Sequence, residues 1–165
     1  MTAAHERLYL HTLHQLVAAG VPFGVLGTFA LRQQCPTLPR RLVADCDLLL
    51  PPEPAILNAL TNLLRASGWR VTLWEQPVTP PLTAADLAGK YYLRARQGDA
   101  VLDCAYENDF LDWPAFWANC QWHHGLPLLT PAAILRQKAQ VGRPADLAVL
   151  HWWQQVGLAA GGPSA

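Results

Sequence analysis

The stretch Arg41-Leu-Val-Ala-Asp-Cys-Asp-Leu-Leu-Leu-Pro51 decides the fold. Its apolar run predicts a short buried strand that stops at a proline, and it carries two acids, Asp45 and Asp47. Because strand side chains alternate between faces, both carboxylates point to one side and Cys46 points to the other. Two close carboxylates repel, and burying them without compensation is costly. A cation between them removes that cost, and Mg²⁺ prefers carboxylate oxygens. The alternative is an acidic pair that caps a turn or lies in solvent.

Length and composition predict one globular domain. The chain has 165 residues, of which 52% are hydrophobic and 15% charged, so it can bury a sizeable core. Its 12 basic and 12 acidic residues cancel, so no general positive field attracts a long nucleic acid. No apolar run is long enough to cross a bilayer or to form a signal peptide. The cysteines are far apart, which argues against a zinc finger, and we expect free thiols in the cytoplasm.

The residues before the acidic strand predict a helix, a strand and a second helix. Apolar residues recur at helical spacing over 3–19, and the glycine-bounded run 21–27 predicts a buried strand. Gly27-Thr28 then leads into a short helix over 29–34. A glycine and a small hydroxyl residue at a helix start can bind phosphate, because the backbone can approach closely there. The alternative is an ordinary turn in which Thr28 caps the helix.

The middle of the chain predicts more sheet. A helix over 54–67 precedes an alternating strand over 69–75. A loop with a helical turn near 83–88 leads to two strands, 90–96 and 100–106, joined as a hairpin. Asp103 lies in the middle of the second of these apolar strands. An unpaired acid there is expensive, so Asp103 either pairs with an arginine such as Arg94 or joins a metal site.

The C-terminal third predicts helices. Asp112 and Pro114 mark the start of a short helix within 109–119, and Thr130-Pro131 opens a helix that reaches about Val141. His123-His124 is predicted to lie in a loop. A last helix follows over 145–156, and residues 159–165 are predicted to be a disordered tail. The core candidates of the last helix are Leu147, Leu150, Trp153 and Val156.

The order of these features resembles the nucleotidyltransferase superfamily, which has the DNA polymerase β-like fold. The shared features are a glycine and a small residue after the first strand, a D-x-D strand and a third acid within a later strand. The segment with Lys138, Arg143 and Asp146 is similar to the Lys…Arg-x-x-Asp segment of small stand-alone bacterial AbiEii-type nucleotidyltransferases. Two positions depart from the pattern: Thr28 stands where Ser or Gly is commoner, and Val149 stands where relatives often have an acid.

The resemblance implies a fold and a site. The fold is α/β (α+β), a mixed and largely antiparallel sheet flanked by helices, with a helical C-terminal segment. One domain is expected over 1–158, with a core over about 20–125 and the helical segment over about 128–158. Asp45, Asp47 and Asp103 would be the catalytic acids and would hold Mg²⁺ or Mn²⁺. Gly27, Thr28 and Lys138 would bind the nucleotide.

The implied activity is transfer of NMP from a nucleoside triphosphate to a hydroxyl acceptor, which is an RNA end, a protein side chain or a small molecule. Two alternatives stand beside it. The chain can be a catalytically silent member of the fold that binds a nucleotide or a protein partner. It can also be a structural domain in which Asp47 and Asp103 pair with arginines such as Arg41 and Arg94. An enzyme needs the three carboxylates to converge beside an open cleft. A purely structural domain needs an arginine for each acid and no cleft.

Overall fold

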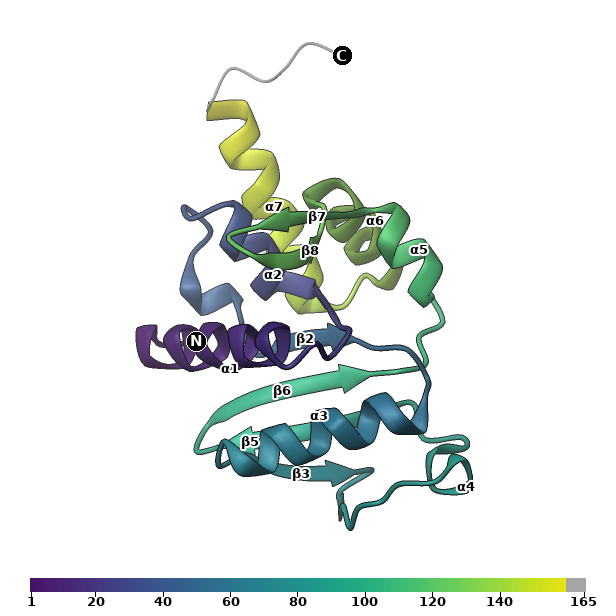
Figure 1. Ribbon diagram of the computed structural model, residues 1–165. Coiled ribbons are helices and arrows are strands. Elements are labelled where there is room, and N and C mark those ends of the chain that lie inside the picture. The colour runs from purple at the N-terminus through teal and green to yellow at the C-terminus, as the bar shows by residue number, and fades with distance from the viewer. Residues whose placement is uncertain (160–165) are drawn as a thin grey trace.

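A computed structural model describes residues 1–159 and shows an α+β fold built on one mixed sheet of eight strands (Figure 1). The strand order is β4-β3-β5-β6-β2-β1-β8-β7. The β1–β8 and β2–β6 pairs are parallel and the other five pairs are antiparallel, which confirms the expectation of a mixed, largely antiparallel sheet. The strands are β1 (Gly24–Leu26), β2 (Cys46–Leu49), β3 (Arg70–Leu73), β4 (Gln76–Pro77), β5 (Tyr92–Gln97), β6 (Ala100–Ala105), β7 (Cys120–His123) and β8 (Leu126–Leu129).

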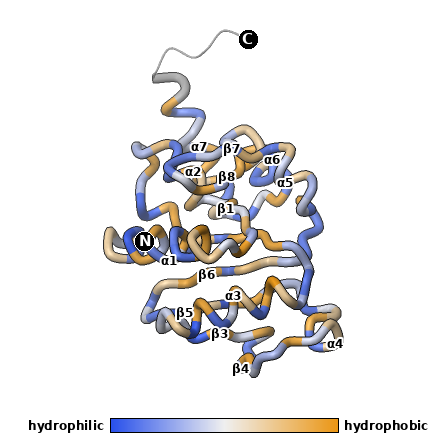
Figure 2. The backbone as a smooth tube through the Cα atoms, in the orientation of Figure 1, coloured by the Kyte–Doolittle hydropathy of each residue, from blue (hydrophilic) through white to orange (hydrophobic). Residues whose placement is uncertain are grey.

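The helices α1 and α3 cover one face of the central strands (Figure 1). Leucines at helical spacing in α3 form its buried side and polar residues interrupt them, as Figure 2 shows by colour. Tyr9 of α1 is fully buried, and its hydroxyl accepts a hydrogen bond from the backbone N–H of Val101 at 2.9 Å. The helices are α1 (Ala3–Ala18), α2 (Gly27–Gln34), α3 (Pro54–Ala66), α4 (Ala84–Leu87), α5 (Trp113–Ala118), α6 (Pro131–Val141) and α7 (Pro144–Ala159), with a 3₁₀ turn at Arg40–Leu42.

The acidic strand lies at the centre of the sheet. Cys46 on β2 and Cys104 on β6 are fully buried and neither forms a disulfide, in agreement with the free thiols expected from the sequence. Asp45 directly precedes β2 and Asp47 is its second residue. The opposite face of β2 and β6 therefore carries the acids and is not covered by α1 and α3.

The C-terminal part differs from the prediction in one element. His123 and His124, which were expected in a loop, belong to the β7–β8 hairpin, which turns at His124 and Gly125, both with positive φ. Strand β8 pairs with β1 and extends the sheet beyond the acidic strand. Strand β4 was also not predicted.

The last helix exposes two of its four expected core residues. Leu147 is 54% exposed and Val156 is 38% exposed, so both assignments were wrong, whereas Trp153 packs against the core. Val149 and Asp146 are the residues of α7 up to Val156 that are buried. Asp146 faces inward, where its carboxylate accepts hydrogen bonds from Lys138 and Arg143. The predicted tail falls outside the described residues from 160 onward.

No helix within residues 1–159 is both long and apolar enough to cross a membrane.

Candidate active site

Strand register brings the acids together. Asp47 on β2 pairs with Leu26 on β1 to one side and with Asp103 on β6 to the other, and Asp103 pairs with Arg94 on β5. Residues that are directly opposite on neighbouring strands share a face. Leu26, Asp47, Asp103 and Arg94 therefore form one row across four strands of the sheet.

The three carboxylates predicted from the sequence converge. One oxygen from each of Asp45, Asp47 and Asp103 lies within 4.8 Å of the other two. Burial, together with the charges of Asp45 and Asp103, raises the pKa of Asp47 from 3.8 to about 7. Burial and the charge of Asp103 also raise the pKa of Asp45. The site thus concentrates negative charge that the protein alone neutralises incompletely.

Asp103 has a protein partner of its own. Arg94 donates from Nε to one Asp103 oxygen at 2.6 Å and from Nη2 to the other at 2.8 Å. The carboxylate in turn raises the pKa of the Arg94 guanidinium. Both interpretations of Asp103 therefore hold together: it pairs with an arginine and it lies in the acidic cluster. Within the described residues, Asp45 and Asp47 form no ion pair, which argues against the purely structural alternative.

Gly27 lies directly against Asp47. Its φ is +70°, in the left-handed region, and a Cβ atom built there would lie 2.1 Å from Oδ2 of Asp47. Only glycine fits this position without displacing the carboxylate. Because Gly27 has no side chain, the start of α2 can pack directly against Asp47 of β2.

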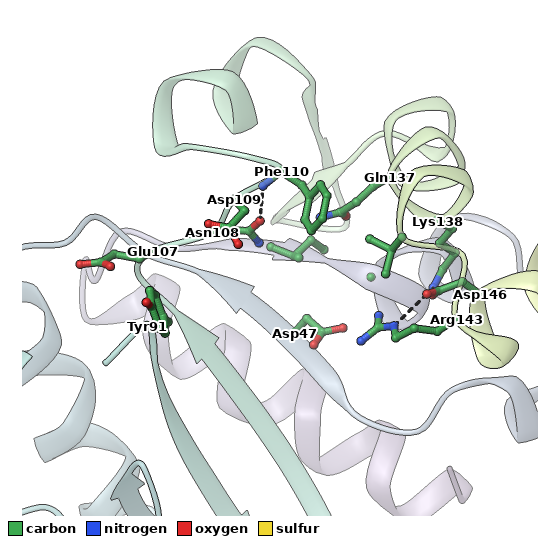
Figure 3. Close-up of a pocket in the computed structure, with 13 residues that line it drawn as sticks. Asp47, Tyr91, Glu107, Asn108, Asp109, Phe110, Gln137, Lys138, Arg143 and Asp146 are labelled. Carbon is green, nitrogen blue, oxygen red and sulfur yellow. Dashed lines mark hydrogen bonds and ion pairs between the residues drawn. The ribbon is translucent and has the colours of Figure 1, made fainter. Parts of the chain in front are cut away.

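A cavity of about 360 Å³ opens beside Gly27 and Asp47. Its basic wall comes from Lys138, in the last turn of α6, and Arg143, in the turn between α6 and α7 (Figure 3). Asp146 holds both: it accepts from Nζ of Lys138 at 2.8 Å and from Nε of Arg143 at 2.9 Å. Burial acts to raise the pKa of Asp146, but these two hydrogen bonds lower it overall. Lys138 is buried, whereas the Arg143 side chain is 72% exposed and lies toward Asp47 in Figure 3.

The opposite wall comes from the loop after β6, which the sequence did not mark as functional. In Figure 3 Asn108 and Phe110 of this loop lie across the cavity from Arg143. The backbone N–H of Phe110 donates to Oδ1 of Asn108 at 2.9 Å, which fixes the loop. The sequence signal that could have marked this loop is its run of polar residues, which directly follows the strand that carries Asp103. The further lining residues that sequence reasoning missed are Leu26, Tyr91, Glu107, Asp109, Gln137 and Val141.

Thr28 occupies a different position from Gly27. It is the second residue of α2, is half-buried and does not line the cavity. No side chain caps this helix. Its predicted contact with phosphate stays a prediction.

The donor set fits a divalent cation. Mg²⁺ and Mn²⁺ bind carboxylate oxygens, and Asp45 and Asp47 offer oxygens that no arginine or lysine of the described chain engages. The raised pKa values of both acids show that their negative charges are poorly compensated. A cation would relieve the repulsion between the acids. The chemistry of the ligands does not distinguish these two metals.

Comparison with known proteins gives structural relatives only. No family model matches the sequence, and no curated protein sequence matches it. A crystal structure of ANT(2″)-Ia in complex with adenylyl-2″-tobramycin is 17% identical, with a TM-score of 0.60 over 90% of this chain and 87% of the other. A solution structure of the antibiotic-resistance factor ANT(2″)-Ia is 18% identical, with a TM-score of 0.55 over 88% and 82%.

A third structure, of a protein from H. pylori that is described provisionally as a nucleotidyltransferase, is 16% identical. Its TM-score is 0.51 over 84% of this chain and 59% of the other. At such identities the likeness concerns the fold, and it agrees with the superfamily that the sequence resembles. The chain has the fold of the nucleotidyltransferases.

Proposed function

We propose that the protein is a metal-dependent nucleotidyltransferase that transfers NMP from a nucleoside triphosphate to a hydroxyl acceptor. The observation that carries the proposal is the convergence of Asp45, Asp47 and Asp103 beside a cavity with a basic wall. If the acids had only a structural role, we would expect each carboxylate to form an ion pair and no cavity beside them. The reaction would take place in the cytoplasm, where nucleoside triphosphates and Mg²⁺ are abundant.

The cavity offers complementary chemistry to a triphosphate. Phosphate oxygens would accept hydrogen bonds from Lys138, whose ammonium has three donors and gives one to Asp146, and from the exposed Arg143. Gly27 leaves room for the phosphates to approach the backbone beside Asp47. Asp146 would keep both basic side chains aimed at the cavity.

The proposed transfer is an in-line displacement at the α-phosphorus. The acceptor oxygen forms the new bond to phosphorus, the bond to the bridging oxygen breaks, and pyrophosphate leaves. A divalent cation bound by Asp45 and Asp47 would neutralise phosphate charge and stabilise the transition state. Asp103 would accept the proton of the acceptor hydroxyl, and the contact with Arg94 would hold its carboxylate in place.

An acceptor screen tests the proposal. The protein is incubated with Mg²⁺, each α-labelled triphosphate and separate pools of RNA ends, peptides and hydroxyl-bearing small molecules. We expect the label to appear on one pool with stoichiometric release of pyrophosphate, and we expect Asp47→Asn to abolish the transfer.

Asp99→Asn is the matched control, because Asp99 is exposed in the turn between β5 and β6, outside the acidic cluster. It should transfer at the wild-type rate. Binding of triphosphate without transfer to any pool would contradict the enzymatic assignment and favour the silent-fold alternative.

A further inference from the structure

Arg94 is a fixed positive charge inside the acidic cluster. Its guanidinium contacts both oxygens of Asp103 through two parallel N–H donors, the strongest geometry for an arginine–carboxylate pair. Since an arginine side chain stays protonated at any physiological pH, this charge cannot be removed by titration. One of the three cluster acids thus carries a permanent counter-ion.

The surroundings hold the guanidinium in place. Its Cζ atom lies 5.3 Å from the centroid of the Tyr92 ring, within the range of a cation–π contact. The backbone of Arg94 is fixed by ladder pairs to β3 and β6, and its carbonyl accepts a hydrogen bond from Thr72 Oγ1 at 3.3 Å. The side chain is 32% exposed, so it is packed along much of its length. Arg94 and Asp103 also line a second cavity of about 230 Å³, and Asp47 lines both this cavity and the one beside Gly27.

The charge balance of the cluster follows from this arrangement. Three carboxylates carry three negative charges when ionised, and Arg94 supplies one positive charge. One divalent cation would neutralise the three acids together with the arginine that is paired with one of them, and Arg143, which lies toward Asp47 in Figure 3, would oppose a second cation further. A second divalent cation would leave excess positive charge next to the Arg94 guanidinium, which hydrogen-bonds to both oxygens of Asp103.

We propose that Arg94 takes the place of a second metal ion beside Asp103, so that the site without nucleotide binds a single divalent cation at Asp45 and Asp47. The inference rests on the proposed function, because it assumes that the acids hold a metal. A further ion would reach the site only together with the phosphates of the nucleotide. Arg94 is thus a positioning residue: it acts on the metal and on the acceptor through Asp103.

The number of bound Mn²⁺ ions tests the inference without any measurement of activity. Electron paramagnetic resonance counts the Mn²⁺ bound by wild type, Arg94→Gln, Arg94→Lys and Arg96→Gln in the absence of nucleotide. Arg96 is a matched control, because it is an exposed arginine on the same strand, two residues away, and forms no ion pair with a described residue. Circular dichroism verifies that each variant is folded.

We expect one Mn²⁺ in wild type, in Arg96→Gln and in the charge-retaining Arg94→Lys, and two in Arg94→Gln. Two ions in wild type would overturn the inference while leaving the metal site itself in place, and this result holds even if Arg94→Gln fails to fold. A second ion in Arg94→Lys, or one ion in folded Arg94→Gln, would overturn the argument from charge. No Mn²⁺ in wild type would instead contradict the proposed function.

Discussion

Gly27→Ala should displace Asp47. The new Cβ atom would lie 2.1 Å from Oδ2 of Asp47, whereas ordinary contacts are about 3.5 Å, so the carboxylate must move by more than about 1 Å. Two costs add. The left-handed backbone conformation costs an alanine about 1–2 kcal/mol, and overpacking costs typically about 1–3 kcal/mol more. We therefore expect a stability loss of about 2–5 kcal/mol, measured by urea denaturation.

Gly20→Ala separates these two costs. Gly20 follows α1 with a φ of +67°, and nothing lies within 4 Å of a Cβ atom at this position. This variant should lose only the backbone contribution of about 1–2 kcal/mol and should bind Mn²⁺ as wild type does. Gly27→Ala should bind Mn²⁺ at least about tenfold more weakly, since a displaced Asp47 is a poorer ligand. Equal stability losses in the two variants, with unchanged Mn²⁺ affinity in Gly27→Ala, would refute the contact between Gly27 and Asp47.

Two further predictions concern the charges of the site. Burial and neighbouring acids raise the pKa of Asp47 from 3.8 to about 7, so the folded protein holds this proton more tightly than the unfolded chain. The metal-free protein should therefore lose stability as the pH rises from about 4 through about 7, and Asp47→Asn should flatten that loss in denaturation curves. Asp146→Asn leaves the buried Lys138 ammonium without its carboxylate and should cost about 3–5 kcal/mol by urea denaturation. Arg143→Gln is its control, because the Arg143 side chain is 72% exposed and its loss should cost less than about 1 kcal/mol.

The acidic site was predictable because its signals are local. Alternation around Asp45 and Asp47 shows that they share a face, and an acid in an apolar strand marks Asp103 as special. The hairpin over 90–106 follows from two apolar runs around a turn, and its register sets Arg94 opposite Asp103. What the sequence left open was whether Asp103 pairs with arginine or joins the cluster. In the structure Asp103 pairs with an arginine and also lies in the cluster, because one carboxylate has two oxygens and several lone pairs.

The hairpin of β7 and β8 was missed for a physical reason. Pro127 lies within β8 and a proline argues against a strand, yet β8 pairs with β1 only at Val25 and Leu128. Strand β8 lies between β1 and β7, but Pro127 has no register partner on β1, so its missing N–H interrupts no pairing there. His124-Gly125 was the usable signal, since a two-residue turn with positive φ joins antiparallel strands.

The orientation of the last helix depends on contacts that are distant in sequence. Leucine spacing placed Leu147 in the core, but Asp146 is the residue that turns inward, because it binds Lys138 on the neighbouring helix. The walls of the cavity are likewise assembled from segments far apart in the chain. The resemblance to AbiEii-type proteins, which concerned this segment, stays a prediction.

Calorimetric binding of ATP, GTP, CTP and UTP, with and without Mg²⁺, shows whether the acidic cluster and its cavity bind a metal–triphosphate complex. The wild-type protein and Asp45→Asn are compared, because Asp45 belongs to the acidic cluster and makes no ion pair with a described residue. We expect at least one triphosphate to bind in a manner that requires Mg²⁺, and we expect Asp45→Asn to abolish this binding. A folded wild-type protein that binds no triphosphate, or one that binds equally well without Mg²⁺ and without the Asp45 carboxylate, would contradict this expectation.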